Sequence, residues 1–291
     1  MFLERLLFLI TGVFVFLCLG FALMMMASGP GKRPVDPAAT PPAAVSAAPK
    51  APPAASLPPA PPPPAPVEAP ATPQQRLEKL IASAPDYARF FARLREAFPA
   101  VHASSMDAFK QQLAGGAPEE SIDFYVSEAV RYLRQARGVA AAKAETAPLE
   151  KVFDIQLRVL RAIAKEDPHM CVTFLYGGTN LDFTRFAATR RPLVAEMALA
   201  GLEAIASGQS KKVERPAPSE ADFKALESAL AAKGLDRVEI DALLDGKMPD
   251  PPLEDARMCA AGQTYLETLQ GLPEAVRLRI YGLAVELMAR S

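Results

Sequence analysis

The feature that most constrains this chain is an apolar run of 22 residues, Leu6 to Ala27, which contains no charged side chain. As an α-helix with a rise of about 1.5 Å per residue, the run would extend roughly 33 Å, which matches the hydrocarbon core of a bilayer. It therefore predicts a transmembrane helix at residues 6–27 within an anchor segment 1–28. The membrane is the first partner that we expect.

A cleaved signal peptide is the alternative to a permanent anchor. The apolar core of a signal peptide is usually about 7 to 15 residues long and ends in small residues. Here the run is longer, and its only small pair, Ala27 and Gly29, would place Pro30 directly after the cut. A lipoprotein signal also fits poorly, because Cys18 lies in the middle of the run. These features favour an uncleaved signal anchor.

Residues 29–75 form a linker that is rich in proline and alanine. Of the 44 residues from 30 to 73, 17 are Pro and 13 are Ala. Such a segment lacks backbone donors and large apolar side chains, so we expect it to be disordered and to sample polyproline II. Its upper length is roughly 135 Å at about 3.1 Å per residue. The stretch PAPPPPAP, residues 59–66, could serve as a docking motif, but a plain spacer is favoured.

The anchor, the stalk and the domain behind them resemble in layout the TonB-like and TolA-like envelope proteins, and the resemblance ends at layout. The basic flanks of the apolar run nearly cancel, with Arg5 on one side and Lys32 and Arg33 on the other. The positive-inside rule therefore does not decide the orientation. A long stiff tether favours a domain held away from the membrane. The Ala-rich, Asn-poor composition indicates a bacterial protein. The apolar run and the tether together predict an inner-membrane protein with a periplasmic domain; a cytoplasmic domain is the alternative.

Residues 76–291 are the only part able to bury a sizeable core, and their apolar periodicity is helical. Leu149, Val152, Phe153, Leu157 and Leu160 recur at intervals of three and four residues. Convincing strand alternation is absent, so the fold class is all-α, an irregular multi-helix domain. We expect about ten helices, near 76–98 with a break at Pro85, 105–114, 119–145, 148–166, 168–177, 190–207, 219–233, 236–245, 252–270 and 273–290.

A polar stretch, 207–219, is a candidate break between two helical subdomains, although a long loop is the simpler interpretation. Leaving out the residues before position 76, the domain holds 28 basic and 30 acidic residues. Phosphate backbones are usually bound by a clear basic excess, so we expect no nucleic-acid partner. An acidic partner or anionic headgroups are more plausible for the local basic stripes Arg89/Arg93 and Arg131/Arg134.

His169 and Cys171 are the nearest approach to reactive chemistry. If Pro168 begins a helix, side chains two positions apart point about 200° from one another, which excludes a dyad between them. For Cys171 three alternatives stay open: a buried thiol, which is favoured, a disulfide with Cys259, or a nucleophile at a helix N-terminus. Two domain cysteines make one bridge arithmetically feasible.

Signatures of common enzymes are missing, since the chain has no HExxH, Walker loop, GxGxxG, GxSxG or SxxK motif. Two histidines and scattered cysteines do not supply a structural zinc site, and no cofactor is expected. Three carboxylate pairs could in principle act as acid and base. They also sit where acids are ordinary in helices, so catalysis is the minority interpretation: Glu119–Glu120, Asp241–Asp245 and Glu254–Asp255.

The segment FLYGGTNLDFTRF, 174–186, combines aromatic residues with a run of arginines. An exposed set at this segment is our candidate for a partner-binding surface: Phe183, Arg185, Phe186, Arg190 and Arg191. The sequence therefore predicts a membrane-tethered helical adaptor or scaffold of the bacterial envelope without chemistry of its own. An envelope hydrolase that uses an acid pair or Cys171 is the alternative.

Overall fold

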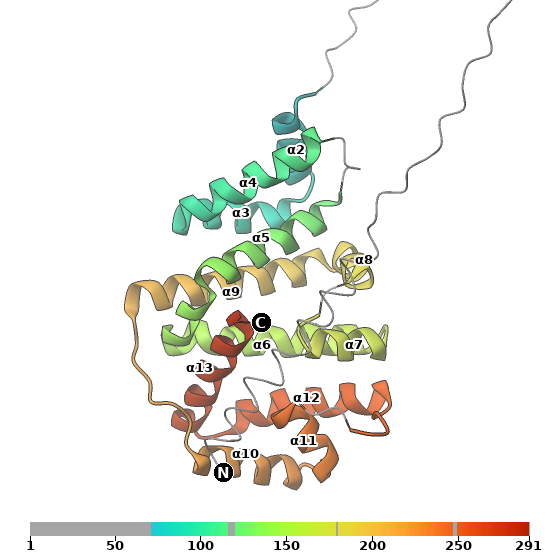
Figure 1. Ribbon diagram of the computed structural model, residues 1–291, viewed down its shortest axis with the longest axis vertical. Coiled ribbons are helices and arrows are strands. Elements are labelled where there is room, and N and C mark those ends of the chain that lie inside the picture. The colour runs from blue at the N-terminus through green and yellow to red at the C-terminus, as the bar shows by residue number, and fades with distance from the viewer. Residues whose placement is uncertain (1–70, 116–119, 179, 247–248, 291) are drawn as a thin grey trace, which may run out of the picture. The chain divides into compact units, whose positions relative to one another are not determined.

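The computed structural model describes residues 71–115, 120–178, 180–246 and 249–290 (Figure 1). Within these ranges the chain forms twelve α-helices and one short 3₁₀ helix and no strand, which confirms the all-α class. The predicted membrane span 6–27 and nearly all of the predicted linker lie outside the described residues. None of the helices within those ranges combines the length and the apolar character needed to cross a bilayer.

The helices follow the predicted order with one addition. Their bounds are α2 Pro73–Ala82, α3 Pro85–Ala97, α4 Pro99–Ala114, α5 Ile122–Arg137, η1 Gly138–Lys143, α6 Thr146–Ala164, α7 Pro168–Leu175, α8 Leu181–Thr189, α9 Arg191–Lys211, α10 Glu220–Ala232, α11 Arg237–Asp245, α12 Asp255–Gly271 and α13 Glu274–Arg290. Helix α8 is the addition, and the predicted helix 76–98 is divided at Pro85 into α2 and α3.

The helices of the described domain pack in successive layers (Figure 1). Helix α9 lies between α3 on one side and α6 on the other, and α6 in turn contacts α12. Helices α10 and α11 pack against α12, while α2, α3 and α4 form a group that contacts the rest of the domain through α9 and α5. The short helix η1 sits against both α9 and α13. The domain is therefore an irregular helical array whose long members are α6 and α9.

Two helices begin earlier than predicted, and the residues at their N-termini explain why. Thr72 caps α2 through a capping box in which its Oγ1 accepts from the backbone of Gln75, so the helix begins at Pro73 rather than 76. Helix α4 begins at Pro99, six residues before the predicted start, because Pro is well tolerated in the first turn. Both signals are legible in the sequence.

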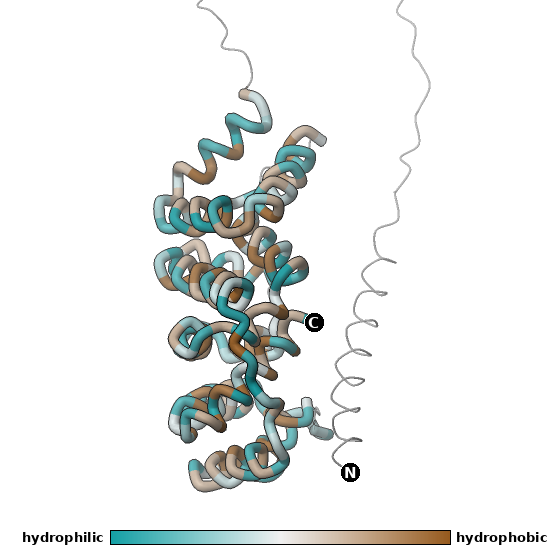
Figure 2. The backbone as a smooth tube through the Cα atoms, turned by 90° about the vertical axis from the view of Figure 1, so that its left-hand side faces the viewer, coloured by the Kyte–Doolittle hydropathy of each residue, from teal (hydrophilic) through white to brown (hydrophobic). Residues whose placement is uncertain are grey.

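The core follows the helical apolar stripes. In α6, Leu149, Phe153, Leu157 and Leu160 are all buried, as the three-and-four spacing predicts. The ring of Phe153 stacks on Tyr281 of α13 with centroids 3.6 Å apart. Figure 2 shows hydrophobic and hydrophilic stretches alternating along the helices, as expected where each helix buries one face.

The connection between α9 and α10 is tied down rather than loose. Val213 donates its backbone N–H to the carbonyl of Lys143 at 2.9 Å, and the guanidinium of Arg215 donates to the carbonyls of Ala142 and Ala144. The described residues on both sides of this segment belong to one compact unit. Residues 212–218 therefore act as a strap over η1.

Candidate functional site

The predicted partner-binding segment folds as α8 and the start of α9. Asn180 caps α8, because its side-chain oxygen accepts from the backbone N–H groups of Asp182 and Phe183 at 3.1 and 3.0 Å. The helix then presents Phe183, Phe186 and Ala187 on one face, at intervals of three and four residues. That face is directed into the domain.

The expectation that Phe183 and Phe186 form an exposed aromatic surface is wrong. The two residues are 3% and 2% exposed. Their rings lie 5.9 Å apart, and Phe183 also stacks on Phe174 of α7 at 5.5 Å. These rings fill the space between α7 and α8 in a domain that has no tryptophan. A buried phenylalanine stabilises the fold more than an exposed one, because its apolar area is removed from water. They are core residues.

The three arginines of this segment are engaged within the domain. Arg185 pairs with Asp182 on its own helix at 2.9 Å, and Arg190 pairs with Glu166 at 2.8 Å. Arg191 pairs with Asp123 of α5 at 2.9 Å. The structure brings Arg190 and Arg191 together at the start of α9, whereas Arg185 lies apart, on an exposed face of α8.

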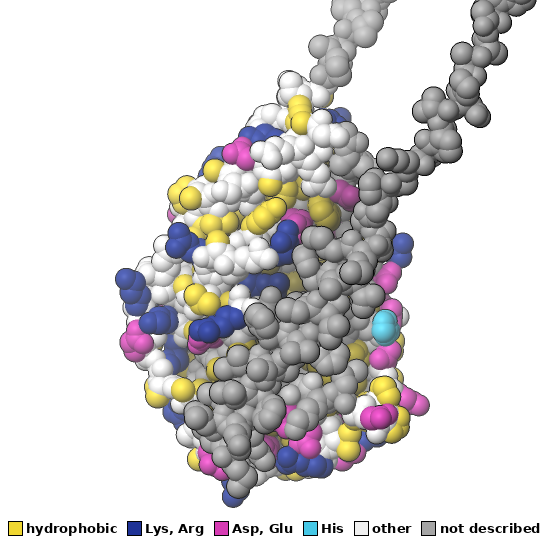
Figure 3. Space-filling model, in the orientation of Figure 1, with side chains coloured by type: hydrophobic (Ala, Val, Ile, Leu, Met, Phe, Trp, Pro, Cys, Tyr) yellow, Lys and Arg dark blue, Asp and Glu magenta, His cyan; other side chains and the backbone are white. Residues whose placement is uncertain are grey.

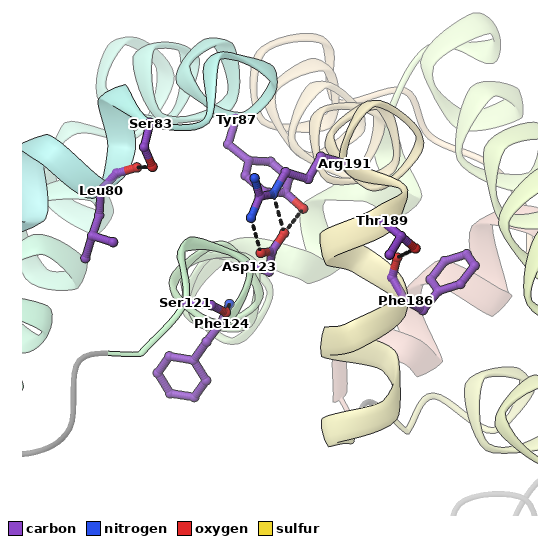
Figure 4. Close-up of polar contacts among 9 residues, drawn as sticks. All are labelled: Leu80, Ser83, Tyr87, Ser121, Asp123, Phe124, Phe186, Thr189 and Arg191. Atoms are coloured by element: carbon purple, nitrogen blue, oxygen red, sulfur yellow. Dashed lines mark hydrogen bonds and ion pairs between the residues drawn. The ribbon is translucent and has the colours of Figure 1, made fainter.

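Arg191, Asp123 and Tyr87 form a polar cluster that joins α9, α5 and α3 (Figure 4). The side chain of Asp123 is completely buried. Arg191 donates to its two oxygens at 3.1 and 2.9 Å, and the hydroxyl of Tyr87 donates at 2.9 Å. Burial, together with the hydrogen bond to Asp123, raises the pKa of Tyr87 well above its usual range. The cluster is a buried ion pair with satisfied partners, which is a structural role.

Asp123 was not predicted as a functional or structural residue. It follows Ile122 and precedes Val126 by three positions, so it lies on the apolar stripe of α5. An acidic residue on the buried face of an amphipathic helix indicates a buried partner of opposite charge. This signal was available in the sequence, but the identity of the partner, 68 residues further along the chain, was not.

The two domain cysteines are joined. Cys171 of α7 and Cys259 of α12 form a disulfide with Cα atoms 5.7 Å apart, and both residues are buried. Of the three alternatives for Cys171, the structure contains the bridge, and a bridged sulfur is no thiolate nucleophile. Close to it, Gly262 faces Leu175, whose Cδ2 would lie 2.6 Å from an added Cβ. Helices α7 and α12 are therefore clamped along their contact.

His169 lies at the surface end of the same contact. Helix α7 begins at Pro168, so His169 and Cys171 point in different directions and form no dyad. The side chain of His169 is 72% exposed, and its Nδ1 lies 2.8 Å from Oδ2 of Asp255 in α12. His169 thus adds a polar bridge between α7 and α12 next to the disulfide.

Two acids of the candidate catalytic pairs, Asp241 and Asp255, have basic contacts in the structure. Asp241 pairs with Arg237 one turn earlier in α11 at 2.7 Å, and Asp255 meets His169. Glu254 precedes the first turn of α12. Glu119 lies outside the described residues. In the described part of the chain, no group of three or more His, Cys, Asp or Glu side chains is arranged to hold a metal ion.

A shallow groove follows the contact of α3 with α9. Two hollows of about 550 and 1000 Å³ flank an ion pair in which Arg93 donates to Glu203 at 2.7 and 3.0 Å. Arg89 and Arg95 border one hollow, and Lys211 borders the other beside Glu145, with which it pairs at 3.6 Å. Most residues that line the two hollows are polar or charged, beside apolar ones such as Phe98 and Leu199, and both hollows are open to solvent. This differs from the concave, mostly apolar pockets that hold small ligands.

Comparisons of the chain with protein-family models, with curated proteins and with solved structures give no match.

Proposed function

We propose that this protein is a membrane-tethered adaptor of the bacterial cell envelope, in which an N-terminal anchor and a Pro/Ala stalk present a helical domain that binds another protein. The anchor and the stalk rest on the sequence of residues 6–27 and 29–75. The domain is the helical array of residues 71–290. No catalytic step is part of this proposal.

The observation that carries the proposal is the buried disulfide between Cys171 and Cys259. Disulfides form and persist in oxidising compartments, such as the bacterial periplasm, and are rare where thiols are kept reduced. A bridged domain behind a membrane anchor therefore favours the periplasmic side, which the charges flanking the anchor leave open. The length of the stalk agrees, because a spacer is needed only if the domain works at a distance from its anchor.

The hydrolase alternative has less support. Its candidate nucleophile, Cys171, is in the disulfide, and two acids of the candidate pairs, Asp241 and Asp255, contact Arg237 and His169. Long-range ion pairs instead fasten helices to one another, as Arg93 with Glu203 and Arg191 with Asp123 do. In these two pairs the charged groups hold helices of the domain together, which is a structural use of charge and not a catalytic one.

The test is a measurement of topology together with thiol protection in the same cells. A reporter that is active only outside the cytoplasm is fused after Ser291, in a chain that carries Cys18→Ser so that only the domain cysteines remain. We expect an active reporter, and we expect Cys171 and Cys259 to resist alkylation until a reductant is added. An inactive reporter with freely alkylated thiols would overturn the periplasmic assignment.

Partner binding is tested separately by photo-crosslinking in cells. A photoreactive amino acid is placed at exposed positions of the domain, and the full chain is purified from membranes. We expect discrete adducts that depend on position. Uniform or absent adducts at all positions, in a chain with the correct topology, would contradict the adaptor function.

A further inference from the structure

Arg134 of α5 is unlike the other arginines of the domain. Its side chain is half-buried, yet this side chain makes no hydrogen bond or ion pair, whereas the side chain of every other half-buried arginine in the described ranges makes at least one. Burial and the nearby charge of Arg131 both lower the pKa of Arg134. Its environment thus disfavours the charge that it carries.

The surroundings of Arg134 on α5 are basic. Arg131, Arg134 and Arg137 are spaced by three residues and share one face of the helix; we call them the α5 basic stripe. Glu128 pairs with Arg131, which leaves Arg134 and Arg137 as a surplus of two charges. Figure 3 shows Lys and Arg side chains at the left-hand edge of the domain, where the ends of α5 and α9 lie in Figure 1.

An apolar side chain lies at the end of the stripe. Val139, two residues beyond Arg137, is 51% exposed, although it is in the short helix η1 that packs against α9 and α13. The neighbouring Gly138 is pressed between Arg134 and Ala289 of α13, with an added Cβ only 2.8 Å from the latter side chain. The end of the stripe is therefore tightly packed against η1 and α13.

Such an arrangement costs stability in the free domain. Burial of the Arg134 side chain removes part of its hydration, and no protein acceptor replaces what is lost, although water still reaches the guanidinium nitrogens. A carboxylate placed against it would supply charge and two parallel hydrogen bonds, and the gain is larger where water is partly excluded. Perturbed charged groups of this kind gather at functional sites more often than elsewhere.

We propose that the α5 basic stripe, with Val139 beside it, is a docking surface for an acidic segment of the partner protein, in which one carboxylate pairs with Arg134. This deepens the adaptor function proposed above and rests on it. Arg137 supplies longer-range attraction at the rim, and Val139 receives an apolar side chain of the same segment.

The charge of the surface argues for a protein segment over other anionic partners. Two surplus arginines contribute only about 1 kcal/mol each at an anionic lipid surface, which is a weak attraction for a domain of this size. Nucleic acid would require a broad basic excess, and the domain carries slightly more acidic than basic residues. A single partner carboxylate needs only the one preformed position at Arg134.

The first test measures binding of the full chain, in neutral detergent, to a dye-labelled peptide of repeated Glu-Glu-Leu units, with a Gln-Gln-Leu peptide for comparison. We expect the acidic peptide to bind and Arg134→Gln to weaken it about tenfold or more, in line with one charge-assisted hydrogen-bonding pair. Arg185→Gln is the matched control, since it removes one exposed arginine from α8, and it should leave binding unchanged.

Three outcomes would overturn the proposal. These are no binding of the acidic peptide, equal weakening by Arg134→Gln and Arg185→Gln, and binding of phosphatidylglycerol vesicles that exceeds binding of the peptide and is lost in Arg134→Gln. Folding is checked by thermal unfolding of each variant. Here Arg134→Met should raise Tm by about 2 to 4 °C, because it replaces an unpaired cation by an apolar chain of similar length.

The second test separates this surface from the adaptor function itself. Photo-crosslinkers are placed at Arg137 and, as a control, at Arg185. We expect an adduct from position 137 that disappears when Arg134→Gln is added. Adducts that arise from other positions, but never from 137, would refute the α5 surface and leave the adaptor function intact.

Discussion

At position 208 the backbone of α9 touches η1 so closely that only hydrogen fits. A Cβ added to Gly208 would lie 1.8 Å from the carbonyl oxygen of Ala140. Gly201, two turns earlier in the same helix, has no heavy atom within 4 Å of such a Cβ. An added methyl group would therefore clash with η1 at position 208 but not at position 201, and the two substitutions should change the free energy of unfolding in opposite directions.

We expect Gly208→Ala to destabilise the domain by about 2 to 3 kcal/mol or more, because α9 must move away from η1. Gly201→Ala should stabilise it by up to about 1 kcal/mol, since alanine is the better helix former. Urea unfolding followed by circular dichroism measures both changes. Equal effects at the two positions would contradict the close approach of α9 and η1.

Arg185 and Arg191 lie six residues apart in the sequence, but their side chains have very different partners and exposure. Removing Arg191 strands the completely buried carboxylate of Asp123, so Arg191→Ala should cost about 3 to 5 kcal/mol. Arg185 is 78% exposed, and Arg185→Ala should change the stability by no more than about 0.5 kcal/mol. Comparison of the unfolding midpoints is the measurement. A small effect at Arg191 would mean that Asp123 is not buried as described.

At the scale of elements, the contact of α7 with α12 depends on one covalent bond. The Cys171–Cys259 bridge spans 88 residues of chain, and closing such a loop in the unfolded state corresponds to about 4 to 5 kcal/mol in the chain-entropy model. We expect dithiothreitol to lower the urea midpoint of the wild-type chain strongly. The Cys171→Ala/Cys259→Ala variant should unfold at the lower midpoint with or without reductant. If dithiothreitol left the urea midpoint of the wild-type chain unchanged, this would contradict the disulfide.

An ion pair between Asp222 of α10 and Arg279 of α13 makes the stability of the domain depend on pH. Arg279 donates to both oxygens of Asp222 at 2.9 and 2.6 Å, and this bond, with further donors at Ser219, holds the pKa of Asp222 well below its usual range. Its contribution to stability is therefore complete above the unfolded pKa of about 4 and is lost as the pH falls further. We expect Asp222→Asn to be less stable than wild type at pH 7 and the difference to shrink towards pH 2. A constant difference would contradict the ion pair.

The helices that the sequence predicted well are those with long apolar stripes. Helices α6 and α13 lie within about two residues of their predicted ends, since three-and-four spacing over many turns admits no other regular structure. Helix α8 is not among the predicted helices. The helix is only nine residues long and contains aromatic and β-branched residues, which have low helix propensity, and its apolar positions resemble an exposed aromatic patch. Its Asn180 cap was the signal that could have located it.

The candidate site was harder to predict because pairing is not local. The sequence shows two groups of nearby arginines, Arg131 with Arg134 and Arg190 with Arg191. It does not show which of these side chains pairs with a carboxylate on another helix. Arg191 does, on a helix 68 residues away, and Arg134 does not. The same limit applies to Cys171 and Cys259, for which arithmetic permits a bridge and only the packing of α7 on α12 supplies the distance.

For the whole molecule, the composition changes sharply near residue 71, from a Pro/Ala-rich segment that we expect not to fold to a domain that buries a core. Residues 30–70 offer no large apolar surface, whereas the described residues from 71 onward belong to one compact unit with a continuous core. The strap of residues 212–218 lies inside that unit and is bonded to η1. These observations predict which parts of the chain a protease reaches first.

We expect limited proteolysis of the full chain with a protease of broad specificity to cut first between residues 30 and 70 and to release one fragment that includes α2 to α13. Mass spectrometry gives the cut sites. The fragment should unfold in a single transition with the midpoint of the full chain, because the linker contributes no contacts that stabilise a core. Cutting at residues 212–218 as early as in the linker, giving two separately folded pieces, would instead establish two subdomains. Arg215→Ala is the variant that should bring that second cut forward, since it removes the hydrogen bonds that tie the strap to Ala142 and Ala144.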